Sequence, residues 1–361
     1  MRSLWGQAIG QRLAHSWIRL RLACGREGSS LRARLFADYE RALLHEFGQS
    51  ERGFILRSRS ILAERGEGLR TYEIVLECKE PQDWEPGDLV YLRWQNSPVR
   101  ISELKARLPV RSAPLRVLSY GHALRPPRWE QVSPEALLSE ILDLHATLPK
   151  EVTWETLCRR QARIRPRVFT VSRVPERGKL PTIELIVSTV GGGRASGYLE
   201  RLAPGECVSG HRLPHPHRLP CAHGFRGAGL CIVTGSALAG VLAHLRGPAR
   251  LPPIWLVWGI KTADQAYYRD ELRHYLHAGH LARLDIVVSR PAGDAGGEYV
   301  QDLVRREAGA IKPFLGSEGW VYVSGQKAMA KAVQHTLVEL YGNDTVSQWR
   351  SRMRLVVSAS G

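Results

Sequence analysis

The stretch GLCIVTG at residues 229–235 decides how the C-terminal part of the chain is predicted to fold. It is a short, almost uninterrupted apolar run, and similar runs follow at PIWLVWG (253–259), LDIVVSR (284–290) and GWVYVSG (319–325). Segments with the apolar spacing of helices separate these runs. Strands that are apolar on both faces and alternate with helices predict a parallel, doubly wound sheet. Ligands of such sheets bind at the carboxyl ends of the strands, so the residues after each run are candidates for a site.

The preceding part of the chain has a strand pattern of another kind. From Tyr72 to Cys78, apolar side chains recur at almost every second position, which is typical of a half-buried strand. A turn at Pro86–Asp88 leads into a further strand, and a strand pattern returns at 167–172. Between these strands two helices are predicted, with Ser133 and Thr153 as their N-caps. An all-β part with a helical insert therefore precedes the parallel sheet.

The N-terminal fifty residues differ from the rest. Trp5, Ile9, Leu13 and Trp17 recur at intervals of four residues, which predicts one apolar stripe on a helix. A linker helix that packs on the body of the protein is favoured over a helix that lies on a membrane surface. Because arginines interrupt the apolar residues, we expect neither a signal peptide here nor a membrane span.

Composition restricts the partners without choosing one. The 361 residues suffice for two ordinary domains. Six cysteines show no CxxC pair and no zinc spacing, which predicts reduced thiols of a cytoplasmic protein and no metal site. A net charge of +16 favours acidic partners: an electron-transfer protein, an anionic dinucleotide or nucleic acid. Nucleic acid is the weakest of these, because no nucleic-acid-binding motif accompanies the charge. A coding bias towards arginine explains the charge equally well.

Several stretches carry the residues on which a functional hypothesis depends. They are PRVFTVS (166–172), GGGRASGYLERLAPGE (191–206), HRLP (217–220), IVTGSALAG (232–240), VVSRPAGDAGGEYVQ (287–301) and VYVSGQKAMAKAV (321–333). Each alone is also compatible with a plain core strand, a flexible glycine loop or an ordinary strand-to-helix turn. Together and in this order they resemble the ferredoxin–NADP reductase module. The resemblance is closest to the version in diflavin reductases, such as the NADPH–cytochrome reductases and the sulfite reductase flavoprotein.

The resemblance runs from about residue 68 nearly to the C-terminus and implies a fold with two parts. The first is an antiparallel β-barrel FAD domain with a helical insert, an element of the diflavin branch that simple ferredoxin reductases lack. The second is a doubly wound parallel-sheet domain that binds NADP. The predicted boundaries are 1–51 for an N-terminal helical extension or linker, 52–225 for the barrel, with its insert at about 128–165, and 226–361 for the NADP-binding domain.

The resemblance also implies a set of FAD contacts. Arg167 would bind the flavin pyrophosphate, since its guanidinium is a forked donor, and the ring of Phe169 would lie against the isoalloxazine. The hydroxyl of Thr170 would bond the flavin N5, the atom that accepts hydride. The glycine-rich turn would close over the diphosphate. The predicted FAD-binding residues are Arg167, Phe169, Thr170, Ser172, Gly193, Arg194, Ala195 and Ser196.

A second implied set would bind the nicotinamide dinucleotide. Its members are Gly235 and Ser236 in the strand-to-helix turn, Ser289 and Arg290 at the 2′-phosphate that separates NADP from NAD, Tyr299 on the adenine, and Gln301 beside it. The family carries a second basic residue two positions before this tyrosine, where the present chain has Gly297. The implied preference for NADP over NAD is therefore weakened.

The chain departs from the family pattern at the point of hydride transfer. Ser324 stands where the family has a cysteine beside the hydride path, and Gln326 replaces an aspartate. The C-terminal sequence MRLVVSASG lacks the family's acidic residue and terminal aromatic. Thr170 and Ser324 are accordingly the predicted catalytic residues, and turnover is expected to be slower than in the family.

The resemblance predicts a flavoprotein oxidoreductase that accepts hydride from NADPH on FAD and passes electrons to a separate acceptor protein. Residues 1–51 are too few for a flavodoxin domain, so the expected acceptor is an acidic flavodoxin, ferredoxin or haem protein that docks on the basic surface. The alternative is a catalytically impaired FAD-binding or interaction protein derived from the same family.

Overall fold

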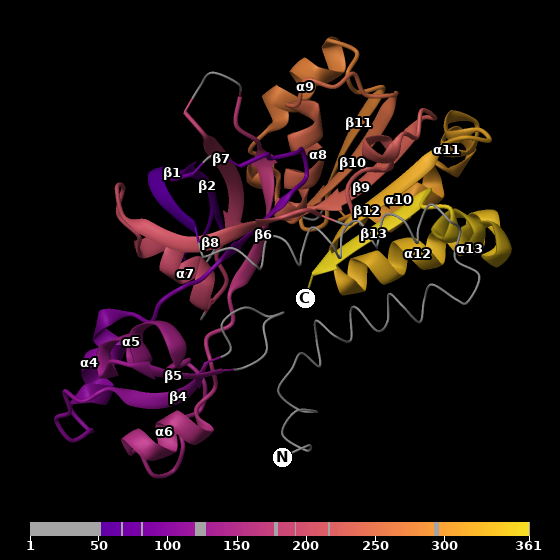
Figure 1. Ribbon diagram of the computed structural model, residues 1–361. Coiled ribbons are helices and arrows are strands. Elements are labelled where there is room, and N and C mark those ends of the chain that lie inside the picture. Colours follow the sequence, from indigo (N-terminus) through magenta and orange to yellow (C-terminus); the bar gives the residue numbers. More distant parts are fainter. Residues whose placement is uncertain are drawn as a thin grey trace.

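The computed structural model describes residues 52–361 apart from 66–67, 81, 120–127, 177–179, 192, 216, 292–295 and 361. The helix predicted around Trp5–Trp17 lies outside these residues. The described chain forms a barrel, a helical insert that protrudes from it, and a parallel sheet with helices on both faces (Figure 1). Among the described residues no helix is both long enough and apolar enough to cross a membrane. Nor do they contain a group of acidic, histidine and cysteine side chains suited to a metal ion.

Six antiparallel strands close the barrel in the order β1-β2-β7-β6-β3-β8, which confirms the predicted fold of this part. The strands are β1 (Arg52–Arg65), β2 (Leu69–Cys78), β3 (Leu89–Leu92), β6 (Arg167–Arg173), β7 (Thr182–Ser188) and β8 (Cys207–Leu213). Side chains that alternate along these strands fill the barrel, among them Phe54, Ile74 and Leu185, which have no exposed surface. Helix α7 (Arg194–Arg201) adds Tyr198 and Leu199 to the same apolar cluster.

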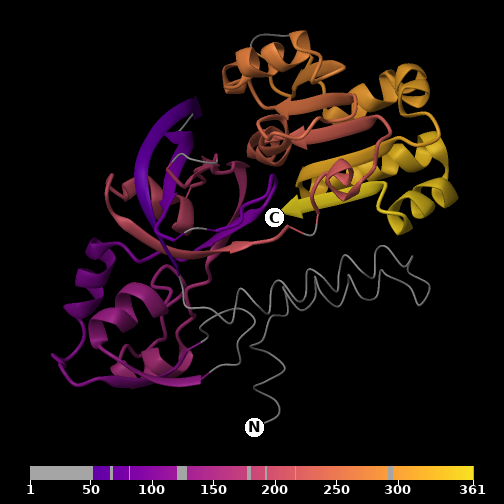
Figure 2. The ribbon, with the colours of Figure 1, turned by 45° about the horizontal axis from the view of Figure 1, so that its top comes forward.

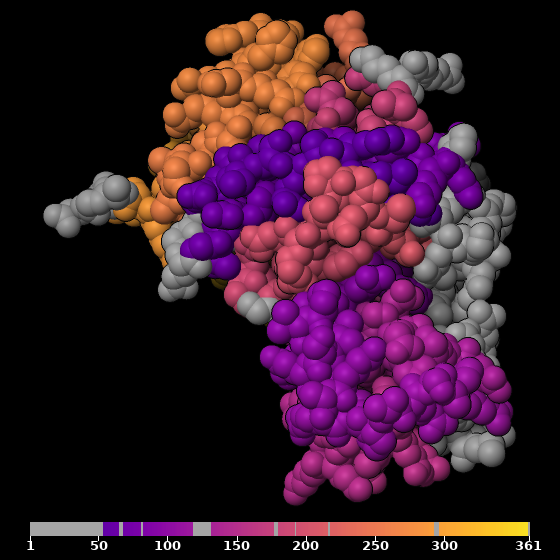
Figure 3. All heavy atoms as spheres, turned by 90° about the vertical axis from the view of Figure 1, so that its left-hand side faces the viewer, coloured from indigo at the N-terminus to yellow at the C-terminus, as the bar shows by residue number. Residues whose placement is uncertain are grey.

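The insert leaves the barrel after β3 and returns at β6. It contains α4 (Pro98–Lys105), β4 (Leu115–Ser119), β5 (Arg128–Val132), α5 (Pro134–Ala136), a short π-helix (Leu137–Ile141) and α6 (Trp154–Arg160). Ser133 and Thr153 cap their helices as predicted. The insert has an apolar cluster of its own, to which α4 and β4 contribute, so it is larger than the expected 128–165. It forms a lobe below the barrel in Figure 3.

The C-terminal part is a parallel sheet in the order β11-β10-β9-β12-β13, as the apolar runs predict. The strands are β9 (Gly229–Thr234), β10 (Ile254–Ile260), β11 (Arg283–Val288), β12 (Trp320–Gln326) and β13 (Leu355–Ser360). Helices α8 (Ala239–Leu245) and α9 (Arg269–His277) cover one face. Helices α10 (Val300–Arg306), α11 (Ala308–Leu315), α12 (Lys327–Tyr341) and α13 (Asn343–Ser351) cover the other. In Figure 2 the end of β13 points towards the barrel.

A buried ion-pair cluster anchors the connection between the two parts. Asp88, at the start of β3, has no exposed surface and accepts a hydrogen bond from Arg212 Nε at 2.7 Å. Its other oxygen pairs with Arg218, which lies in the segment between β8 and β9 and also pairs with Glu85. Arg218 belongs to the HRLP stretch, so in this chain the arginine of that motif has a structural role.

Candidate functional site

Strand β6 presents the first group of predicted residues in alternating directions. Phe169 and Val171 pack on the apolar cluster inside the barrel, whereas Thr170 faces outward to helix α8. Its methyl carbon lies 3.7 Å from the position that a Cβ would take on Gly240. Ser172 has no exposed surface, and its hydroxyl donates to the carbonyl of Glu184 at 3.0 Å. The structure therefore leaves Thr170 accessible and half-buried but does not bring Ser172 to the site.

The glycine-rich turn forms the N-terminus of α7. Gly193 is the N-cap residue, and a Cβ on it would lie 2.5 Å from Ser196 Oγ and 2.8 Å from the carbonyl oxygen of Val190. Only glycine fits this close approach. The N–H groups of the first helical turn, at Arg194–Ser196, have no acceptor within the helix and are therefore available to an anion.

Arg194 has a partner that its position in the sequence does not reveal. Its guanidinium pairs with the carboxylate of Asp143, a buried residue of the insert. The other oxygen of this carboxylate accepts the N–H of His145 at 3.0 Å. Arg194 thus ties α7 to the insert, and part of its charge is compensated before any ligand binds.

The same part of the insert also contacts the segment that leads into β6. The N–H of Asp143 donates to the carbonyl of Ala162 at 2.8 Å, and Ala195, Ile164 and Phe169 pack on one apolar cluster. Arg167 is exposed there, and in the described part of the chain no carboxylate pairs with it. Val168, which follows Arg167, and Val190, three residues before Gly193, expose 37% and 58% of their surface. A free cation, free N–H groups and uncovered apolar side chains fit a ligand with a phosphate group and an apolar body.

A side chain of the neighbouring strand β10 contacts the turn that follows β9. Gly235 has φ 55°, in the left-handed region that favours glycine. Its carbonyl accepts the indole N–H of Trp258, a fully buried side chain of β10, at 3.1 Å. Ser236 follows in the short 3₁₀ helix Gly235–Leu238 and is half-buried. The indole contact, which fixes the orientation of the turn, was not foreseen from the sequence, because nothing in the motif refers to β10.

The two predicted catalytic residues are connected through Gly240 of α8 and Tyr322 of β12. Ser324 is buried and lies between Val233 of β9 and Ser358 of β13 in the strand register. Burial raises the pKa of Tyr322 to about 12, although a hydrogen bond with the Ser324 hydroxyl lowers it in part. The Cβ position of Gly240 is 3.1 Å from the Tyr322 hydroxyl and 3.7 Å from the Thr170 methyl carbon. Thr170 of the barrel and Ser324 of the sheet therefore border the same place.

The predicted 2′-phosphate residues follow β11. Ser289 Oγ donates to the carbonyl of Ile260 at 3.2 Å, and the N–H of Arg290 donates to the carbonyl of Lys261 at 2.7 Å. The side chains of Arg290 and Lys261 are exposed, and among the described residues neither has an acidic partner. Lys261, which follows β10, thus supplies a second cation that the motif comparison missed.

The backbone around Gly297 leaves no room for a side chain at the position of the family's second basic residue. A Cβ on Gly297 would lie 2.1 Å from the carbonyl oxygen of Ser289, so a larger residue does not fit without a backbone shift. Tyr299 is the N-cap residue of α10 and is 57% exposed, and Gln301 is half-buried in the first turn. These placements leave the tyrosine ring accessible to a ligand.

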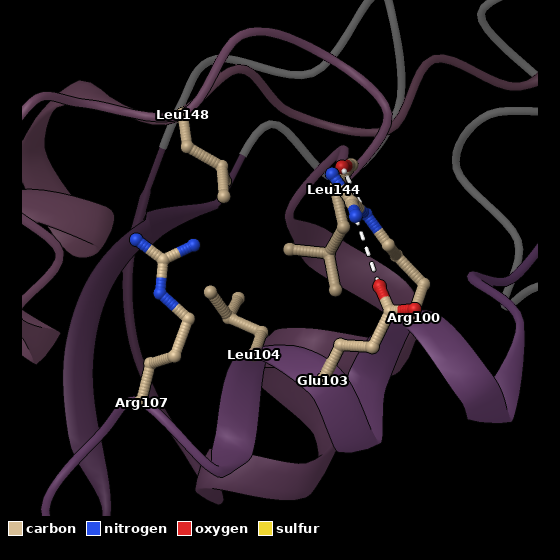
Figure 4. A pocket seen from close by; sticks show the side chains of 6 residues that line it. All are labelled: Arg100, Glu103, Leu104, Arg107, Leu144 and Leu148. Carbon is tan, nitrogen blue, oxygen red and sulfur yellow. Dashed lines mark hydrogen bonds and ion pairs between the residues drawn. The ribbon is translucent and has the colours of Figure 1, made fainter.

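A pocket elsewhere in the molecule holds none of the predicted residues. It lies in the insert and is lined by Arg100, Glu103, Leu104, Arg107, Leu144 and Leu148 (Figure 4). Arg100 and Glu103 pair with each other at 2.9 Å. The pocket is separate from the site at the carboxyl ends of the strands.

Comparisons with known proteins agree with this geometry. Residues 232–335 match the family model of the oxidoreductase NAD-binding domain. Methionine synthase reductase from Mus musculus is 38% identical over 98 residues, which are 25% of this chain and 14% of that protein. Ferredoxin–NADP reductase B from Sorangium cellulosum (strain So ce56) is 30% identical over 154 residues, or 40% of this chain and 61% of that protein.

The sulfite reductase (NADPH) flavoprotein alpha-component of Vibrio vulnificus (strain CMCP6) is 27% identical over 218 residues, or 55% of this chain and 34% of that protein. The matches thus cover less than two thirds of the length of each of these relatives. These matches support, for the C-terminal part of the chain, a module of the ferredoxin–NADP reductase type found in diflavin reductases.

Proposed function

We propose that the chain is an oxidoreductase that binds FAD at the barrel and NADPH at the parallel sheet and passes electrons to a separate acceptor protein. The observation that carries the proposal is that Thr170 of the barrel and Tyr322 of the sheet, which bonds Ser324, both face Gly240 of α8. When bound, FAD would supply the chemistry of accepting a hydride and releasing electrons one at a time. The residues of the chain would bind the two cofactors, orient them and exclude water between them.

The residues present fit an FAD molecule. Arg167 is exposed and could bind the diphosphate, and the first-turn N–H groups of α7 would supply further donors. The hydroxyl of Thr170 has no hydrogen-bond partner among the described residues, so it can donate to a ring nitrogen at the outer face of β6. Phe169 is half-buried against the barrel cluster, which would place its ring beside the bound cofactor rather than fully over it.

The dinucleotide site favours a phosphorylated ligand. Arg290 and Lys261 are adjacent exposed cations, and Ser289 supplies a hydroxyl beside them. Positive charge without acidic partners attracts a phosphate monoester more strongly than a neutral ribose hydroxyl. This arrangement supports NADPH over NADH, with Lys261 in place of the basic residue that Gly297 excludes.

The proposed acceptor is an acidic protein. Relatives of this chain are named as reductases of methionine synthase and as a sulfite reductase component. The formal net charge of +16 would steer an acidic partner to the molecule and would make the association rate fall with ionic strength.

Anaerobic reduction tests the proposal. The purified protein is incubated with FAD, freed of excess cofactor, and mixed with NADPH without oxygen while the flavin absorbance is followed. Bleaching is expected. Thr170→Val should retain FAD and bleach about tenfold more slowly, because it loses one hydrogen bond at the reacting centre. Thr182→Val removes a hydroxyl from another barrel strand and should match the wild type. A protein that takes up no FAD would refute the proposal.

A second candidate function is that of a catalytically impaired FAD-binding protein. The observation in its favour is the carboxyl end of β13, where Ser358 and Ala359 stand in the region at which the resemblance implies an acidic residue and an aromatic ring. A protein that binds FAD and stays yellow with NADPH would support this function instead.

A further inference from the structure

A buried arginine joins the barrel to the parallel sheet. Arg246 directly follows α8, and only 3% of its side chain is exposed. Its Nε and Nη2 donate to the two carboxylate oxygens of Glu271 at 2.7 and 2.6 Å. Its Nη1 donates to Glu184 at 3.0 Å. Glu271 lies on α9 beside the sheet and Glu184 lies on β7 of the barrel, so one guanidinium bridges both parts.

A tyrosine doubles this connection. The guanidinium of Arg246 lies 4.9 Å from the centre of the Tyr268 ring, at the start of α9. The hydroxyl of Tyr268 donates to Glu73 of β2 at 2.5 Å. Glu184 also pairs with Arg173 of β6 at 2.8 Å. Glu184 of β7 and Glu73 of β2 therefore attach the barrel to Arg246 at the end of α8 and to Tyr268 at the start of α9. We call this set the Arg246 clamp (Arg246, Glu184, Glu271, Tyr268 and Glu73).

Arg246 and Glu271 stabilise each other's charged form in the folded protein. Burial alone would lower the pKa of Arg246, but the hydrogen bonds and charge of Glu271 outweigh it and raise that pKa. Burial alone would raise the pKa of Glu271, but the hydrogen bonds and charge of Arg246 outweigh this effect, so the pKa of Glu271 is lowered. Removing Arg246 would leave the carboxylate of Glu271 without its charged partner in a largely buried site, which is unfavourable.

The clamp lies at one end of α8, and the predicted catalytic residues lie at the other. Gly240, next to Thr170 and Tyr322, precedes Arg246 by six residues, or about 9 Å along the helix. Arg246 also donates to the carbonyl of Ser172, two residues after Thr170, at 3.4 Å. Helix α8 is thus held against β6 at its C-terminal end. A displacement there would move its other end, where a shift of about 1 Å can cost about a hundredfold in rate.

We propose that Arg246 is a positioning residue, whose bonds to Glu184 and Glu271 hold α8 against β6 in the arrangement that brings Thr170 and Ser324 together. The role of this arrangement in hydride transfer rests on the proposed function, whereas the holding of the two parts does not. The guanidinium fork is required, because a lysine ammonium cannot bond the two oxygens of Glu271 and reach Glu184 in the same plane.

A distance measurement tests the holding of the two parts without any cofactor. Spin labels are placed on the exposed Cys207 of β8 and on Lys331→Cys of α12, in a chain with Cys24, Cys158 and Cys221 replaced by serine. The distance distribution should be narrow in the parent chain and broad in Arg246→Lys. Arg305→Lys is the matched control, since Arg305 bonds Glu339 and Thr336 within the sheet part only, and it should stay narrow.

Reduction kinetics test the second half of the inference. With FAD bound, Arg246→Lys should lower the limiting rate of anaerobic reduction by NADPH at least about tenfold, while the half-saturating NADPH concentration changes less than about threefold. If Arg246 acted in binding alone, the substitution would change the half-saturating NADPH concentration and leave the limiting rate unchanged. Tyr268→Phe, which removes only the hydroxyl contact with Glu73, should show a smaller effect in both measurements and serves if Arg246→Lys does not fold.

Three results would overturn the inference. Narrow distance distributions in both clamp variants, Arg246→Lys and Tyr268→Phe, would show that the clamp does not hold the two parts. Broad distances with an unchanged limiting rate would show that the arrangement does not matter for the reaction. Broad distances in Arg305→Lys as well would show a general loosening. A parent chain that takes up no FAD would refute the proposed function, and the distance measurement would still decide whether Arg246 holds α8 against β6.

Discussion

Replacing Asp88 by asparagine should destabilise the protein by about 3 kcal/mol. The substitution keeps the shape of the side chain and removes its charge at a position with no exposed surface. Arg212 and Arg218 would then keep side chains that are only 13% and 14% exposed, without the carboxylate between them. Breaking a buried pair in this way costs about 3–5 kcal/mol. We expect the lower end, because Glu85 still pairs with Arg218.

Urea unfolding followed by far-ultraviolet circular dichroism measures this loss. Glu155→Gln is the matched control, since its partner Arg159 is 75% exposed and the pair contributes less than about 0.5 kcal/mol. Asp88→Asn should shift the unfolding midpoint clearly, and Glu155→Gln should leave it in place. A loss below about 1 kcal/mol for Asp88→Asn would refute the reasoning, because the buried charges would then not depend on this carboxylate.

Three further predictions concern the site and its surroundings. Gly193→Ala places a methyl group 2.5 Å from Ser196 Oγ, so it should lower the free energy of unfolding by about 1–3 kcal/mol and release FAD. In the control Gly191→Ala the new methyl group has no neighbouring atom within 4 Å, and the variant should keep the flavin content of the wild type. Gly297→Lys should weaken NADPH binding although it adds a charge, because its Cβ meets the Ser289 carbonyl at 2.1 Å; tighter binding in titrations would contradict this. Burial lowers the pKa of His244 to about 4, so the unfolded chain binds the proton more tightly than the folded chain does. The free energy of unfolding should therefore be highest above pH 6.5 and should fall by roughly 3 kcal/mol towards pH 4. His244→Gln should flatten that part of a urea series against pH.

The sheet could be predicted because its pattern is local. Each of β9, β10, β11 and β12 is a nearly continuous apolar run, and the run alone indicates a strand buried on both faces. Strand β13 (Leu355–Ser360) was missed, because its second half, Ser358–Ser360, is small and polar and it lies at the edge of the sheet. The insert was underestimated for a related reason: α4 has few apolar residues, and only its contact with the insert's own core reveals where it belongs.

The placement of candidate residues at the strand ends could be predicted, but the contacts among them could not. Strand ends of a parallel sheet meet at one edge, so Gly235, Ser289 and Ser324 are expected there from topology. Arg194 pairs with Asp143 at a separation of 51 residues, and the indole of Trp258 reaches Gly235 across 23. Such contacts depend on how distant elements pack, and no local pattern encodes them. The Arg246 clamp is of the same kind, since its members come from β2, β7, α8 and α9.

The described chain passes from barrel to sheet once, between Leu213 and Gly229. All strands of the barrel come before this passage and all strands of the sheet after it, so no backbone ladder is shared between the halves. A gene crossover or a protease cut within the passage would leave every strand pairing intact on both sides. The amino-acid sequences of the two parts can consequently diverge at different rates, or one part can be replaced by that of a related protein, provided that the side chains at their contact remain compatible. Docking of the two halves then depends on side-chain contacts between them and on Arg218, which ties the passage itself to Asp88 of the barrel.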